Sequence, residues 1–183
     1  INRTGMEILN NWLDHSNFFS LIFVSLCFLF IINGANLIDG YNGLLGIHSL
    51  IIIINLFLIN FLNGNSILTN FLFIEIIILL IFLYFNFPKA KIFLGDSGSY
   101  FLGAFVAVSA IKTSLANPEI SPFYFCILLF YLFFEVFFSF FRKLRQRKSP
   151  IYPDDKHLHM LSFYKISRTY GKNKGNYLNS III

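Results

Sequence analysis

The sequence predicts an all-α fold: a polytopic integral membrane helical bundle with about five complete spans and the start of a sixth. Two observations lead to this prediction. The 183 residues are 56% hydrophobic and only 13% charged, which is far too apolar for a soluble domain of this length. Five apolar runs also approach the roughly 20 residues that a spanning helix needs. They cover 18–32, 44–62, 67–87, 100–111 with its flanks, and 122–141, and a sixth starts at 177.

Positive charges orient the predicted spans. Of the 14 lysines and arginines, ten lie in the segment 142–176 and two lie in the loop 87–99. The connections on the opposite side contain only Arg3 and Lys112. Because loops rich in Lys and Arg remain in the cytoplasm, we expect both basic segments on the cytoplasmic side. The 33–43 corner lies two spans before the 87–99 loop and is expected on the same side.

Four polar side chains at three-residue spacing separate the first two runs. They are Asn33, Asn36, Asp39 and Asn42. At this spacing they share one helix face or one tight helix-to-helix corner, and the glycines among them leave room for a bulky group. Such a polar row at a membrane boundary indicates a ligand site. The alternative is local: Asp39 and Asn42 would cap the helix that begins near Leu44.

A second polar cluster opens the fourth run. Asp96 lies between Gly95 and Gly98, with Ser97 beside it, directly before an apolar helix. A helix N-terminus offers unpaired N–H groups suited to phosphate, but a carboxylate beside phosphate needs a divalent cation between the two charges. Mg²⁺ meets this need, with Mn²⁺ as the alternative. An ordinary turn with a Ser or Asp cap is the competing interpretation.

The third cluster lies in the basic loop 142–176. It contains Arg142, Asp154, His157 and His159. Two histidines two residues apart point to one side only on an extended backbone, so we expect a loop site. Taken alone, the run of bases is typical of a juxtamembrane patch that faces anionic lipid. Zinc binding by the histidines with an aspartate is a further alternative, although no other ligands have metal spacing.

Two carboxylates, Glu75 and Glu135, fall inside apolar runs. An ionised carboxylate in hydrocarbon costs about 3 kcal/mol, so each should face protein or water. Glu75 matches no motif, and we expect it to pair with another helix. Glu135 lies about two turns before Arg142, and two roles stay open for it: the floor of a site, or a tie between helices.

The three clusters, in this order, resemble the signatures of the polyprenyl-phosphate sugar-1-phosphate transferases, the MraY/WecA-type membrane enzymes. The resemblance rests on Asn-Gly-Ala-Asn-Leu-Ile-Asp-Gly-Tyr-Asn-Gly from residue 33, Gly-Asp-Ser-Gly-Ser from residue 95 and His-Leu-His from residue 157. It implies the following roles: Asp96, Asp39, His157 and His159 as catalytic residues, Asn33, Asn36, Asn42, Ser97, Lys91, Arg142 and Asp154 as substrate-binding residues, and Asp96 as the metal ligand.

The chain departs from the family pattern at two places. Met160 stands where many members have a third histidine, so that role is absent or belongs to another group. Members also carry an acidic pair two loops upstream, and no such pair precedes Asn33. We therefore expect a single transmembrane catalytic domain over 1–183 that is incomplete at both ends.

The resemblance implies transfer of N-acetylhexosamine-1-phosphate from a UDP-sugar to undecaprenyl phosphate, with release of UMP, in cell-envelope glycan synthesis such as that of lipopolysaccharide. Its partners would be the two substrates, the lipid bilayer and a second copy in a homodimer, with no nucleic acid. The expected location is the bacterial cytoplasmic membrane, with the site facing the cytoplasm. Alternatives are the phospho-N-acetylmuramoyl-pentapeptide branch of the family, a transporter of a small anion, and a non-catalytic lipid-binding scaffold.

Overall fold

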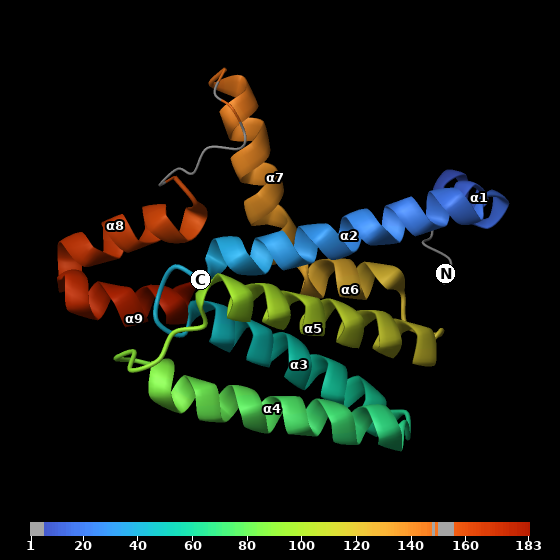
Figure 1. Ribbon diagram of the computed structural model, residues 1–183, viewed down its shortest axis with the longest axis horizontal. Helices are drawn as coiled ribbons and strands as arrows, with labels where there is room; N and C mark the ends of the chain where they lie inside the picture. Colours follow the sequence, from blue (N-terminus) through green and yellow to red (C-terminus); the bar gives the residue numbers. More distant parts are fainter. Residues whose placement is uncertain (1–5, 148, 150–155) are drawn as a thin grey trace.

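The computed structural model describes residues 6–147, 149 and 156–183, and this part of the chain is almost entirely helical (Figure 1). It contains no strand, which confirms the predicted all-α class. In chain order the helices are α1 (Glu7–His15), α2 (Asn17–Ile38), α3 (Leu44–Leu62), α4 (Ser66–Asn86), α5 (Gly95–Ala116), α6 (Pro122–Leu128), α7 (Phe130–Arg145), α8 (Leu158–Tyr170) and α9 (Lys172–Ile182).

Four helices of the described residues, α2 to α5, are long and apolar enough to cross a membrane. Helices α6 and α7 together form a fifth candidate, but a bend of 66° separates them. The polytopic membrane bundle is thus confirmed, whereas an unbroken helix over 122–141 is wrong. No Pro or Gly marks the break near Leu129. A tertiary contact lies beside it instead: α7 packs on α2, and Gly34 lies so close to the Leu132 carbonyl that a Cβ would overlap it.

The core forms around α3, which packs against both α4 and α5. Ile52, Ile53 and Leu56 of α3 are almost completely buried. Helix α2 packs closely on α5, since a Cβ on Gly103 would come within 2.7 Å of the Ala35 Cβ. Small residues allow such close helix contacts in membranes, where lipid supplies no competing hydrophobic force.

Polar side chains tie the helices together at the end away from the basic loops. The amide of Asn63, next to the α3–α4 turn at Gly64, donates to Asn117 Oδ1 at 2.7 Å and to Glu119 at 2.9 Å. Deeper in the bundle, Ser109 of α5 donates to Glu75 of α4 at 3.0 Å. The expected pairing of Glu75 with another helix is therefore confirmed.

The turn 39–43, the loop 87–94 and the helices α8 and α9 gather at one end of the bundle, on the left in Figure 1. We call this the site end. Helix α1 and the α3–α4 turn lie at the opposite end. The 142–176 segment, expected to be a loop, contains α8 and the start of α9. Residues 177–182, expected to open a sixth span, continue α9, which packs on α8 and α3.

Candidate active site

The corner between α2 and α3 places its four polar residues on different elements. Asn33 and Asn36 lie in the last turns of α2, and Asp39 follows its end. Asn42 lies in the turn before α3, whose N-cap is Gly43 in the left-handed conformation (φ 80°). Within the described residues no side chain caps α3, so the alternative that Asp39 and Asn42 act as N-caps is wrong.

Three neighbouring segments hold this corner. The Gly43 N–H donates to Oδ1 of Asn86, at the end of α4, at 2.6 Å. The side chain of Asn42 donates to the Pro88 carbonyl at 3.0 Å, and its backbone N–H donates to Oδ1 of Asn176 in α9 at 3.0 Å. The turn is therefore fixed by contacts far apart in the sequence.

Asp96 reaches the same corner from the first turn of α5, as the sequence predicts. The amide of Asn36 donates to Ser99 Oγ at 2.9 Å and to Asp96 Oδ1 at 3.4 Å. Ser99 in turn donates to the Asp96 carbonyl at 3.0 Å. No side chain caps α5, which leaves the Asp96 carboxylate exposed toward the pocket and not engaged in a cap.

A pocket of about 220 Å³ opens between these elements. Asp39 and Asp96 both line it, and burial together with the negative charge of Asp96 raises the pKa of Asp39 from 3.8 to about 6. The remaining lining residues are Asn36, Gly40, Tyr41, Asn42, Asn86, Phe93 and Gly95. Two carboxylates and several amide oxygens around one small space make a site that favours a cation.

The donor set suits Mg²⁺ better than zinc. Within the described part of the chain, no three His, Cys, Asp or Glu side chains are grouped so that they could hold a metal ion. Zinc sites use three or four such ligands, mostly nitrogen and sulfur. Mg²⁺ is commonly held by one or two carboxylates, with water and substrate phosphates completing its coordination. Asp39 and Asp96 fit that pattern, because they share a pocket and Asp96 already destabilises the ionised form of Asp39.

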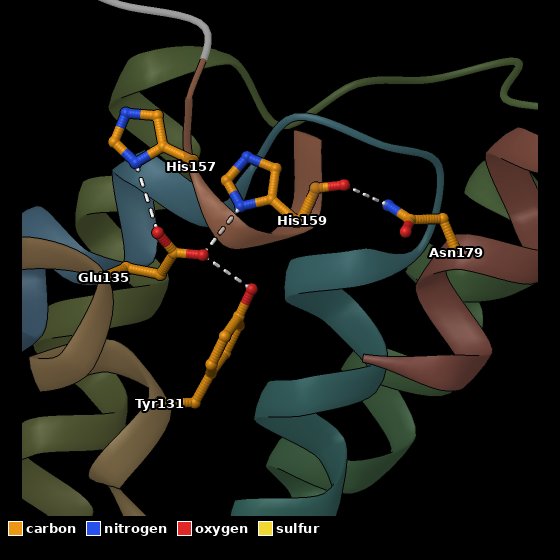
Figure 2. A network of polar contacts seen from close by, with 5 residues as sticks. All are labelled: Tyr131, Glu135, His157, His159 and Asn179. Atoms are coloured by element: carbon orange, nitrogen blue, oxygen red, sulfur yellow. Dashed lines mark hydrogen bonds and ion pairs between the residues drawn. The ribbon is translucent and has the colours of Figure 1, made fainter. Parts of the chain in front are cut away.

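The two histidines meet on a single carboxylate of α7 (Figure 2). Glu135, whose side chain is 0% exposed, lies 3.2 Å from Nδ1 of His157 and 3.1 Å from Nδ1 of His159. Tyr131 also donates to Glu135, at 2.9 Å. The imidazole rings stack with centroids 5.5 Å apart and planes 8° apart. His157 is extended, as expected for a loop, but His159 already belongs to the first turn of α8.

The histidine cluster adjoins the pocket through the corner. A Cβ on Gly40 would lie 3.3 Å from Nε2 of His159, and the Tyr41 ring packs edge-on to His159 at 5.8 Å. Gly40 and Tyr41 also line the pocket. Asn179 of α9 donates to the His159 carbonyl at 2.9 Å, which fixes the backbone on the other side.

Several predicted site residues lie outside this arrangement. Asn33 is exposed and donates to Leu29 of its own helix at 2.7 Å, and it is absent from the pocket lining. Ser97 and Lys91 are exposed and are likewise absent from the lining. Arg142 lies over the Phe138 ring at 5.4 Å, on α7. Asp154, with Asp155 of the zinc alternative, lies outside the described residues.

Sequence reasoning missed four residues that the structure adds: Tyr41, Asn86 and Phe93 on the pocket, and Tyr131 on Glu135. A usable signal existed only for Asn86, a lone amide that ends an apolar run just before Pro88. The aromatic residues carried no signal in a chain with 25 Phe and 9 Tyr.

Comparison with known proteins points to one family. The profile of glycosyl transferase family 4 matches residues 1–114. The chain is 32% identical over 147 residues to the undecaprenyl-phosphate alpha-N-acetylglucosaminyl 1-phosphate transferase of Thermotoga maritima, covering 80% of this chain and 44% of that protein. A probable undecaprenyl-phosphate N-acetylglucosaminyl 1-phosphate transferase of Bacillus subtilis is 30% identical over 133 residues, 70% of this chain and 36% of that protein.

A phospho-N-acetylmuramoyl-pentapeptide-transferase of Dictyoglomus turgidum is 36% identical over 132 residues, 71% of this chain and 42% of that protein. The chain thus spans less than half the length of these curated relatives. No solved structure matches the chain.

Proposed function

Since the chain belongs to glycosyl transferase family 4, we propose that the protein transfers a sugar-1-phosphate from a UDP-linked N-acetylated sugar to a polyprenyl phosphate. UMP would leave, and the lipid-linked product would enter cell-envelope glycan synthesis at the cytoplasmic face of the bacterial inner membrane. The names of two relatives support undecaprenyl phosphate as acceptor and N-acetylglucosamine-1-phosphate as the transferred group.

One observation supports this proposal most directly. The carboxylates of Asp39 and Asp96 line a small pocket at the site end, and His159 of the histidine pair lies against the same corner at Gly40. The three clusters come from distant parts of the sequence, yet they meet where an amphiphilic acceptor would present its phosphate. The meeting point favours chemistry at the membrane surface over binding near the midplane, where transporters usually place their sites.

The chemistry joins two anions, so the protein must position them and reduce their repulsion. The acceptor phosphate oxygen would attack the donor phosphorus next to the sugar, and the bond to the UMP oxygen would break. When bound at Asp39 and Asp96, Mg²⁺ would neutralise part of the charge that builds up between the phosphates. Asn36 holds the Asp96 carboxylate, and the amides around Asn42 would bind the nucleotide.

The two imidazoles and several basic side chains would complete the site. His157 and His159 would contact the diphosphate or the sugar. Lys89, Lys91, Arg142 and Arg145 would raise the local concentration of both anionic substrates at this face. The role of Asp154 in substrate binding stays a prediction from the resemblance.

Phospho-N-acetylmuramoyl-pentapeptide transfer is the second candidate, favoured by the relative in Dictyoglomus turgidum. Met160 in place of a third histidine, and Asn42 in place of a common aspartate, favour the N-acetylhexosamine branch. The family match favours transfer over the small-anion transporter and the lipid-binding scaffold.

The test is a UMP-release assay on the complete gene product in liposomes, with UDP-N-acetylglucosamine and undecaprenyl phosphate. Asp96→Asn should abolish release without affecting membrane insertion, because the amide cannot supply the charge that the cation needs. The matched control is Asp14→Asn in α1, an exposed aspartate at the opposite end, which should retain turnover. Turnover near wild type in Asp96→Asn would contradict the metal assignment, and release of UMP with no lipid product would contradict the transfer.

A further inference from the structure

The Glu135 carboxylate contacts both histidines, and its surroundings define how it bonds. It is 0% exposed and has three neighbours within hydrogen-bond distance: the Tyr131 hydroxyl and one Nδ1 from each imidazole. An ionised carboxylate only accepts hydrogen bonds. In the ionised form Glu135 therefore requires that each histidine carry its proton on Nδ1.

The protonation of Nδ1 then determines the state of the second nitrogen of each ring. Which nitrogen of an imidazole binds a ligand is set by the hydrogen bond that the other nitrogen makes. Figure 2 shows the second nitrogen of both rings on the side away from Glu135. For His159 this nitrogen, Nε2, is buried and has no hydrogen-bond partner among the described residues, and a Cβ on Gly40, which lines the pocket, would lie 3.3 Å from it.

Burial makes this arrangement rigid. A carboxylate removed from water is costly unless donors or positive charge compensate it. Here Tyr131, His157 and His159 supply three donors, and the stacked rings hold each other parallel. Loss of any one contact would leave a buried polar atom unsatisfied.

We propose that Glu135 is a positioning residue for the reaction: it fixes His157 and His159 in the Nδ1–H form and directs Nε2 of His159 toward the donor-binding corner at Gly40. This assignment rests on the proposed function for its catalytic meaning. Glu135 itself touches no substrate.

Glu135→Gln tests the proposal, because it keeps the shape but has one acceptor oxygen and one NH₂ donor. The NH₂ group can bond only a bare Nδ1, so one histidine should switch to the Nε2–H form. In the complete gene product labelled with ¹⁵N-histidine, one of the two imidazole spin systems should change tautomer. The kcat/KM for the UDP-sugar should fall by about tenfold or more, as is usual when the outer partner of a functional imidazole is lost.

Glu75→Gln is the matched control, since Glu75 is also a buried carboxylate in an apolar helix, but within the described residues its hydrogen-bond partner is Ser109 alone. It should leave both histidine tautomers unchanged. If Glu135→Gln fails to accumulate, Glu135→Asp replaces it, because a carboxylate one methylene shorter cannot keep both Nδ1 contacts without a shift. Native histidine signals in the accumulating variant, or a kcat/KM loss no larger than in Glu75→Gln, would overturn the proposal.

The spectroscopic readout is independent of turnover. A tautomer switch in a protein that transfers no sugar phosphate would leave the positioning role standing and remove the proposed function. Active transfer in a protein whose histidine tautomers do not depend on Glu135 would leave the proposed function standing and overturn the positioning role.

Discussion

Asn36 in α2 and Asp96 in α5, 60 residues apart in the sequence, are joined by a hydrogen bond of 3.4 Å from the Asn36 amide to Oδ1. The same amide donates to Ser99 one turn further along α5. Asn36 therefore orients the carboxylate that we assign to the cation.

Asn36→Ala should weaken Mg²⁺ binding at the site more than it lowers the stability of the fold. Without the amide, the Asp96 carboxylate rotates freely, and the Mg²⁺ concentration for half-maximal UMP release should rise by about tenfold. Asn33→Ala is the comparison, because within the described part of the chain the Asn33 side chain bonds only to Leu29 of its own helix. An equal rise in the required Mg²⁺ concentration in both variants would mean that the polar residues between 33 and 42 act together, as the sequence alone suggested.

The raised pKa of Asp39 predicts a pH-dependent effect of Mg²⁺ on stability. Its folded-state value of about 6 exceeds the ordinary 3.8, so the folded protein binds the extra proton between these values. This contribution to stability is present at low pH and is lost as the pH rises through about 6. Without divalent cations the unfolding temperature should fall across this window, and Mg²⁺ should restore it above the window more than below it.

Asp39→Asn should remove both the pH dependence and the Mg²⁺ effect. Thermal melts at several pH values, with and without EDTA, measure this. A melt profile of Asp39→Asn that matches wild type would show that another group titrates.

Gly34→Ala should displace α7. A Cβ at this position would overlap the Leu132 carbonyl, one turn before Glu135, at a cost of about 1–3 kcal/mol by overpacking. Both the unfolding temperature and the donor kcat/KM should fall. Gly64→Ala is the control, since its surroundings are open and only its φ of +73° is strained. A loss of stability with unchanged kcat/KM in Gly34→Ala would show that the α2–α7 contact does not influence the site.

Membrane orientation can be checked with single cysteines in a background lacking Cys27 and Cys126. Cysteines at Asn42, Ser97 and Lys156 belong to the site end, and one at Ala116 lies at the opposite end. We expect cytoplasmic labelling of the first three and opposite labelling of the fourth. Labelling of Asn42 and Lys156 from different sides would contradict a single site.

Replacement of both His157 and His159 by Gln separates a substrate site from a lipid-binding patch. Membrane association should not change, because the charged run stays intact, whereas donor kcat/KM should fall by tenfold or more, about 1.4 kcal/mol. Full activity in this variant, together with loss on neutralising Arg142, Lys143, Arg145, Arg147 and Lys148, would show that the basic run is an electrostatic anchor.

The spans and the corner were predictable because they depend on local signals. Hydropathy identified α2 to α5, and three-residue spacing correctly placed Asn36 and Asp39 at one corner. Charge asymmetry placed the corner, the Asp96 turn and the histidines at one end of the bundle, where the structure has them.

The rest depends on contacts between distant residues. No Pro or Gly in the sequence marks the bend before α7, which lies beside the contact between Gly34 and Leu132. Helices α8 and α9 are short and polar, so they resemble a loop in hydropathy. The sequence marked Glu135 as unusual but could not identify its partners, because they lie 22 and 24 residues later.

The α3–α4 turn is a suitable position for an inserted epitope. Gly64 has open surroundings, and the 19-residue helix α3 separates it from the site end by about 28 Å. If the site end faces the cytoplasm, as we propose, a short epitope inserted there would lie on the opposite surface of the membrane, and exposed turns tolerate insertions. Antibody capture through that epitope would immobilise every molecule with the same face free, so substrates could be delivered to an array of uniformly oriented sites.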